Sequence, residues 1–209
     1  MKKINALVEE YDRLYKHLPD TQEELEDYIV EKYNVNLNKV EESINEIKNI
    51  EWETIHLVLP LVPKPTPRPR MTSGGHVYVK NAKLHKQFFE SIIRSKEIVF
   101  TVTKIDIKTY LPIPTSSMNS TEILLAQKGY IRPISGGDWD NLAKTYCDMM
   151  QGVLISNDNI IVDGSLSKFY SLKPKVDITL SYQVGFDSKY NRRKVITSKL
   201  YKSLIESVK

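Results

Sequence analysis

Acidic side chains concentrate in one stretch of this chain, residues 135–163, which reads SGGDWDNLAKTYCDMMQGVLISNDNIIVD. Asp138 and Asp140 are separated by one residue, and Lys144 follows four residues later. More aspartates stand at positions 148, 158 and 163. Two carboxylates about 6 Å apart repel by roughly 0.7 kcal/mol in water and by about 3 kcal/mol at an effective dielectric of 20. In a cleft, such repulsion calls for a cation.

The cation that these residues suit is a hard divalent metal ion. Mg²⁺ takes oxygen ligands, usually a few carboxylates together with waters and substrate phosphates. Asp158 lies just before an apolar run, so a loop can return it to the vicinity of Asp138 and Asp140, and these three are the candidate metal ligands. The chain has no HExxH motif, no CxxC pair and no Gly-rich phosphate loop. Neither zinc nor a nucleotide cofactor is therefore expected.

A helix must position these side chains, and we expect it over residues 141–151 with Asp140 as its N-cap. At about 100° per residue, its apolar half holds Leu142, Ala143, Tyr146, Cys147, Met149 and Met150, and its polar half holds Asn141, Lys144, Thr145, Asp148 and Gln151. Asp140, Lys144 and Asp148 then form one exposed stripe. The stripe is either a salt-bridge ladder worth a few tenths of a kcal/mol or a row of functional groups.

The rest of the chain indicates an α+β fold with a helical unit in front of it. Apolar spacing predicts helices within residues 1–50, where Thr21 and Glu24 form a capping box. Alternating and β-branched runs predict strands further on, and Gly-Gly predicts a hairpin turn. The expected strands are 54–62, 97–112, 159–170 and 175–184; the hairpin is 71–79; the expected helices are 81–96 and 119–129.

Charge divides the chain into three expected domains: an acidic helical appendage (1–50), a central domain (51–185) and a basic tail, expected to be helical (186–209). Residues 1–50 carry seven basic and twelve acidic side chains, a net charge of −5. Residues 51–209 carry 23 basic and 14 acidic side chains, a net charge of +9. Such a surplus suits a nucleic-acid-binding surface, although an ordinary basic surface also accounts for it. The appendage suits packing or oligomerisation.

Composition points to the cytoplasm. The single cysteine, Cys147, excludes an intramolecular disulfide framework. The first residues turn acidic by Glu9, unlike a signal peptide. No apolar run approaches the roughly 20 residues that span a bilayer, so no membrane association is expected.

The acidic stretch resembles the RusA family of Holliday-junction resolvases. Asp138, Asp140, Asn141, Leu142 and Lys144 match the family's Asp-x-Asp-Asn-Leu-x-Lys motif, Asp148 and Gly152 match the motif after it, and Asp158 matches the second residue of an Asp-Asp pair. Asn157 stands where the pair has its first aspartate, and Gly137 stands where the family often has Pro or a basic residue. The upstream segment PKPTPRPRMTSGGHVYV is also similar to the family's Pro-rich segment, and the resemblance spans residues 54–184.

This resemblance implies a two-layer mixed β-sheet with helices packed on it, and a Mg²⁺-dependent endodeoxyribonuclease that cuts four-way DNA junctions as a homodimer in recombination or repair. Asp138, Asp140 and Asp158 would bind Mg²⁺, with Mn²⁺ as an alternative, and Lys144 would orient the phosphate. A direct role for Asp148 stays open. A non-catalytic branched-DNA-binding protein and a nuclease for flaps or forks are the alternatives.

DNA contacts are expected from basic residues on and after the Pro-rich segment. Prolines at 63, 65, 67 and 69 keep the backbone extended, and alternate residues of an extended chain project to one side. Lys64, Arg68 and Arg70 can therefore contact phosphates, and Lys80 adds to the same charge; the alternative is that they are solvated linker charges. Such contacts position DNA without reading its sequence.

Overall fold

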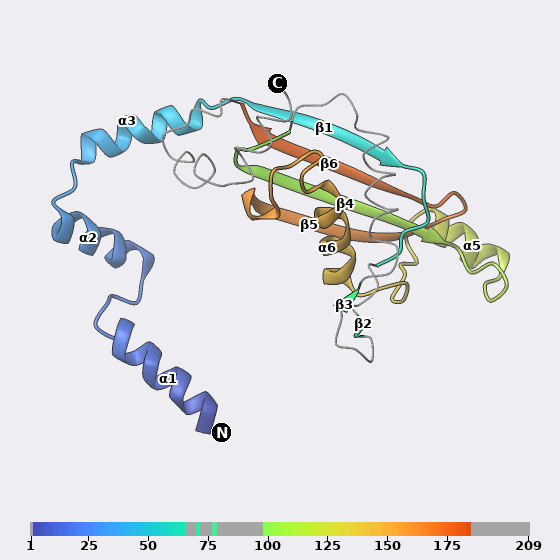
Figure 1. Cartoon of the computed structure of the whole chain (residues 1–209), viewed down its shortest axis with the longest axis horizontal. Helices are drawn as coiled ribbons and strands as arrows, with labels where there is room; N and C mark the ends of the chain where they lie inside the picture. Colours follow the sequence, from blue (N-terminus) through green and yellow to red (C-terminus); the bar gives the residue numbers. More distant parts are fainter. Residues whose placement is uncertain (1, 66–69, 72–76, 79–97, 185–209) are drawn as a thin grey trace. The chain divides into compact units, whose positions relative to one another are not determined.

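The computed structural model describes residues 2–65, 70–71, 77–78 and 98–184 (Figure 1). The chain separates into two compact units, Met1–Ile50 and Glu51–Lys209. The helix expected over 81–96 and the basic tail at 186–209 lie outside the described residues. None of the described helices has the length and apolar character needed to span a bilayer.

The first unit consists of three helices, α1 (Lys2–Tyr15), α2 (Gln22–Tyr33) and α3 (Leu37–Lys48). The predicted capping box is confirmed, because Thr21 and Glu24 exchange side-chain and backbone hydrogen bonds at the start of α2. Neither α2 nor α3 has a buried residue. An apolar row on α3 stays exposed: Leu37, Val40, Ile44 and Ile47.

The second unit is built on a four-stranded mixed sheet in the order β1 (Trp52–Leu59), β6 (Lys175–Gln183), β4 (Thr103–Pro112) and β5 (Ile161–Ser171) (Figure 1). β6 pairs antiparallel with β1 and β4, whereas β4 and β5 are parallel. A separate two-stranded hairpin joins β2 (Arg70–Met71) to β3 (Val77–Tyr78). The predicted α+β fold, a mixed sheet preceded in the sequence by helices, is thus confirmed.

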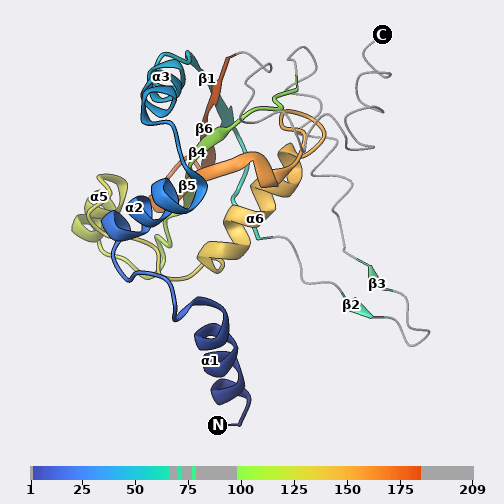
Figure 2. The same cartoon turned by 90° about the vertical axis from the view of Figure 1, so that its left-hand side faces the viewer.

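Alternation along β4 divides the sheet into an apolar and a polar face. Thr103, Ile105, Ile107, Thr109 and Leu111 are buried, and the residues between them are more exposed. A parallel pair needs a long crossover connection, and the chain between β4 and β5 supplies it with α5 (Ser120–Gln127) and α6 (Trp139–Met150). Figure 2 shows α6 lying along one side of the sheet.

The core lies between α6 and the apolar face of the sheet. Leu142, Tyr146 and Met150 of α6 are at most 1% exposed, and they belong to one buried cluster with side chains from all four strands. The predicted apolar half of this helix is therefore confirmed at its buried positions. The prediction for Thr145 was wrong, because Thr145 is buried although it was assigned to the polar half. Its hydroxyl donates to the Asn141 carbonyl oxygen at 2.6 Å, which satisfies the buried polar group.

Candidate active site

A tight turn made by Gly136 and Gly137 leads the chain into α6. Their φ angles are +84° and +115°, a region that residues with a Cβ rarely adopt. A Cβ at Gly136 would lie 2.1 Å from Cδ2 of Leu111, and a Cβ at Gly137 would lie 3.1 Å from the ring of Pro65. The two glycines thus let the backbone pass closely between β4 and the start of the Pro-rich segment, directly before Asp138.

Two cationic side chains fasten this turn to β5, which is an edge strand of the four-stranded sheet. The Lys168 ammonium donates to the carbonyl oxygens of Gly137 and Ser135 at 3.2 and 3.4 Å. Arg132 donates to the Lys168 carbonyl oxygen at 2.5 Å, and its guanidinium lies 3.6 Å from the centre of the Phe169 ring. Neither residue is predicted by the sequence motifs, since no motif marks a lysine 31 positions away as the support of this turn.

The helix begins two residues earlier than predicted. Asp138, not Asp140, is the N-cap residue, and the first helical residue is Trp139. Asp138 adopts the extended backbone conformation of a cap without a side-chain capping hydrogen bond. Asp140 lies in the first turn, where a negative charge interacts favourably with the positive end of the helix dipole. Both aspartates are exposed at the start of α6.

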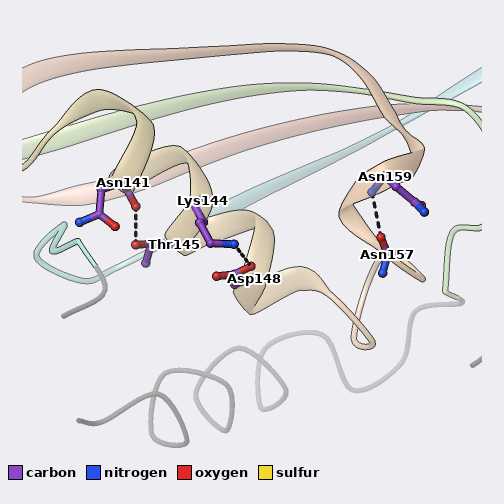
Figure 3. A network of polar contacts seen from close by, with 6 residues as sticks. All are labelled: Asn141, Lys144, Thr145, Asp148, Asn157 and Asn159. Atoms are coloured by element: carbon purple, nitrogen blue, oxygen red, sulfur yellow. Dashed lines mark hydrogen bonds and ion pairs between the residues drawn. The ribbon is translucent and has the colours of Figure 1, made fainter. Parts of the chain in front are cut away.

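The predicted stripe on α6 is exposed at Asp140, Lys144 and Asp148. The Lys144 ammonium donates to a carboxylate oxygen of Asp148 at 3.0 Å, and both side chains project from the same side of the helix (Figure 3). The hydrogen bond and the charge of Asp148 raise the pKa of Lys144, and the Asp158 carboxylate adds a smaller contribution. Lys144 therefore keeps its positive charge throughout the neutral range.

The loop after α6 returns the chain toward the sheet and carries Asp158. Gly152 turns the chain with φ +74°, and the amides of Val99 and Ser156 hydrogen-bond to Leu154 and Val99 carbonyl oxygens. Asp158 is exposed and opens a 3₁₀ turn, Asp158–Ile160. Asn157 caps this turn, because its side-chain oxygen accepts from the Asn159 amide (Figure 3).

The charge of Asp158 affects the pKa values of two residues on α6, Cys147 and Lys144, and this indicates where Asp158 lies. Burial raises the pKa of the Cys147 thiol to about 11, and the charges of Asp158 and Asp148 contribute to this increase. Asp158 thus lies within electrostatic range of the Lys144–Asp148 part of α6. Positions 140 and 148 are about 12 Å apart along a helix axis at 1.5 Å per residue.

The described residues contain no group of three or more His, Cys, Asp or Glu side chains close enough to hold a metal ion. Asp138 and Asp140 stand at the start of α6, whereas Asp158 influences groups further along the helix. In this conformation the three candidate ligands therefore do not form one ligand group. Their assignment stays a prediction, and so does that of Lys144.

The predicted DNA contacts are described only in part. Lys64 is exposed, and it borders a pocket of about 180 Å³ that Thr145, Tyr146 and Met149 of α6 also line. With Pro65 against Gly137, this places the start of the Pro-rich segment beside α6. Arg70 belongs to β2, of which only the backbone is described, while Arg68 and Lys80 lie outside the described residues.

Comparison with known proteins extends these observations. A family model described as endodeoxyribonuclease RusA matches residues 60–181. Among curated proteins, the chain is similar to "Uncharacterized protein YqaN" of Bacillus subtilis (strain 168), with 31% identity over 121 residues, which cover 54% of this chain and 85% of that protein. The family match includes the turn, α6 and the loop that carries Asp158, and it leaves out residues 1–50.

Proposed function

Because the chain belongs to the RusA family of endodeoxyribonucleases, we propose that it resolves four-way (Holliday) DNA junctions by Mg²⁺-assisted hydrolysis of phosphodiester bonds. The observation that carries this proposal is that one family match, residues 60–181, contains Asp138, Asp140, Lys144 and Asp158 together with Lys64. The proposed setting is DNA recombination or repair in the cytoplasm of a bacterium or a phage-infected host cell.

In this proposal Asp138, Asp140 and Asp158 would hold the metal ion. Exposed carboxylates supply the oxygen donors and negative charge that Mg²⁺ requires, and Mn²⁺ accepts the same donors. When bound, the ion would supply charge neutralisation at the scissile phosphate and would make a water molecule more acidic. The protein's own contribution is placement: the Gly136–Gly137 turn and Lys168 hold the backbone before Asp138, and the first turn of α6 holds Asp140.

Lys144 is proposed to orient the scissile phosphate or to stabilise the leaving oxygen. Changing it to alanine should lower the cleavage rate by about 10²-fold, as losing one preorganised charge-stabilising donor does. Since the pKa of Lys144 is raised above 10.5, its charged form persists until the pH passes that higher value, and the ratio of wild-type to variant rates should stay constant from about pH 7 to pH 10. Single-turnover cleavage rates across this range measure both effects.

The matched control is Lys108→Ala, which breaks another exposed ion pair, Lys108–Asp106, on β4. Exposed pairs contribute roughly 0–1 kcal/mol, so both variants should unfold close to the wild-type temperature. Equal cleavage by wild type and Lys144→Ala would leave Lys144 with only a salt-bridge role.

Lys64 is proposed to contact a DNA phosphate. Replacing it with alanine should weaken binding to junction and duplex alike, and should reduce the slope of log K against log salt concentration by about 1. Anisotropy of a fluorescent junction at several salt concentrations, without divalent metal, gives this slope. Lys39→Ala, in the acidic first unit, is the control that keeps the wild-type slope; an unchanged slope for Lys64→Ala would make Lys64 a solvated charge.

The acidic first unit, residues 1–50, is proposed to be dispensable for cleavage. It lies outside the family match, and residues 51–209 form a compact unit that includes the whole sheet and α6. A chain that begins at Glu51 should therefore cleave a junction at the rate of the full chain in a single-turnover assay. Loss of cleavage by a correctly folded Glu51–Lys209 chain, judged by its circular dichroism and thermal unfolding, would assign residues 1–50 to the nuclease itself.

A homodimer is also proposed, because resolution of a junction needs two symmetric cuts and a twofold dimer offers two equivalent sites.

The whole proposal is tested by incubating the protein with an end-labelled four-way junction, a flap, a fork and a linear duplex, each with Mg²⁺ or with EDTA. Paired, symmetric nicks in the junction that require Mg²⁺ are the expected result. Preferential cutting of the flap or fork would redirect the substrate assignment.

A non-catalytic branched-DNA-binding protein is the second candidate. It is favoured by the lack of a grouped metal-ligand set among the described residues and by the Lys144–Asp148 ion pair, which already partners the lysine. In the same assay this candidate predicts binding to the junction with no nicks under any metal condition. The two candidates are therefore separated by cleavage alone.

A further inference from the structure

Trp139 stands between the two aspartates at the start of α6, and its side chain is not part of the core. Although tryptophan is largely apolar, this residue is 53% exposed. Its neighbours in the sequence, Asp138 and Asp140, are exposed as well. The proposed hydrolysis assigns no role to this large exposed aromatic side chain at the start of the candidate active site.

The ring of Trp139 is held at one edge. Its indole N–H donates to the carbonyl oxygen of Leu166 at 2.8 Å, and Leu166 belongs to the edge strand β5. The backbone just before Trp139 is fixed by Lys168, also on β5, through the Gly137 carbonyl oxygen. A ring restrained in this way loses little conformational freedom when its exposed surface is covered by a flat partner.

The surroundings of the ring decide which partner suits it. Asp138 and Asp140 flank Trp139 in the sequence. The Lys168 ammonium donates to the backbone carbonyl oxygen of Gly137, two residues before Trp139. An apolar protein surface placed over the ring would desolvate these charges, and charged residues are depleted at the cores of protein interfaces. A nucleotide brings an aromatic face together with an anionic phosphate that attracts metal ions and lysine, so it satisfies both kinds of neighbour.

We propose that Trp139 is a nucleobase-stacking residue, which receives an unstacked base next to the phosphate at the candidate active site. This inference rests on the proposed DNA-cleaving function and deepens it. Bases inside a continuous duplex are already stacked on each other, whereas bases at a branch point are more accessible. Stacking on Trp139 thereby favours branched DNA over linear duplex without reading sequence.

The chain has two tryptophans, so each can be observed alone. Trp52 lies at the start of β1, where the Lys104 ammonium is 5.1 Å from its ring centre, and it takes no part in the candidate site. In a Trp52→Phe protein, tryptophan emission reports Trp139 only. Titration with a four-way junction in Ca²⁺, and in parallel with linear duplex, should quench this emission with the junction and much less with the duplex. In a Trp139→Phe protein, the emission of Trp52 should not change.

Affinity separates stacking from a purely structural role. Stacking of one base on an aromatic side chain is worth about 1–3 kcal/mol, so Trp139→Ala should weaken junction binding about 5- to 150-fold. Trp139→Phe removes the hydrogen bond to Leu166 but keeps a ring, and it should retain most of the affinity. If the residue only fastened α6 to β5, Phe and Ala would weaken binding equally and lower the unfolding temperature equally.

The anisotropy of a labelled junction, recorded in the same titrations, separates two failures. Junction binding with unchanged Trp139 emission would overturn the stacking role and leave the proposed function standing. Absence of any DNA binding would overturn both. Quenching of equal size with junction and duplex would overturn the preference for unstacked bases.

Discussion

Replacing Asp140 with asparagine should abolish junction cleavage while leaving the protein folded. The expected loss in single-turnover rate is at least about 100-fold, because even the loss of an outer-shell partner of a metal ligand costs 10- to 100-fold. Asparagine keeps the size of the side chain and removes its charge. Asp140 is exposed, so the free energy of unfolding should fall by no more than about 1 kcal/mol, the upper size of an exposed charge–helix-dipole interaction.

The matched control for this variant is Asp163→Asn, which removes another exposed carboxylate, on β5, outside the candidate ligand set. This control should cleave at the wild-type rate. The Asp140→Asn protein should still bind the junction without divalent metal, since removal of a negative charge does not weaken phosphate contacts. Full cleavage by Asp140→Asn would remove this residue from the catalytic machinery.

The largest loss of stability is expected for Leu142→Ala. Leu142 is fully buried in the core between α6 and the sheet, and its Cγ would lie 3.4 Å from a Cβ at Gly137. Truncating a buried leucine costs about 2–5 kcal/mol, because apolar contacts are lost and a cavity remains. The midpoint of urea unfolding should fall accordingly, and cleavage should fall at temperatures where the variant unfolds.

Leu172→Ala serves as the control for this truncation. Leu172 is 66% exposed, so the same change there should alter the unfolding free energy by no more than about 0.5 kcal/mol. An unfolding midpoint for Leu142→Ala equal to that of Leu172→Ala would contradict the packing of α6 on the sheet.

The periodicity of the sequence predicted the main elements because their signals are local. Apolar positions three and four residues apart placed Leu142, Tyr146 and Met150 of α6 in the core, and alternation marked β4. The start of α6 was predicted two residues late, because Asp138 and Asp140 are equally good caps by residue type. The turn at Gly136 and Gly137, shaped by Leu111 and Pro65, decides between them.

The candidate site depended on information that local patterns do not carry. The support of the turn comes from Lys168 and Arg132, whose contacts join segments 31 and 36 residues apart. The angular position at about 100° per residue placed Thr145 on the polar half of α6, yet its hydroxyl donates to the backbone one turn earlier, which lets it be buried. A loop was predicted to return Asp158 to the start of α6. The contribution of Asp158 to the raised pKa of Lys144 instead indicates that its carboxylate lies near the middle of the helix, and the three aspartates do not form one ligand group.

The proposed metal site is tested by titrating the full-length protein with Mn²⁺ in the presence of a four-way junction, while electron paramagnetic resonance measures the free ion. We expect the wild-type protein and Asp163→Asn to remove free Mn²⁺ equally. The Asp138→Asn, Asp140→Asn and Asp158→Asn proteins should each bind Mn²⁺ much more weakly. Mn²⁺ binding of equal strength by all five proteins, or none by the wild type, would contradict the claim that these three carboxylates hold the divalent ion.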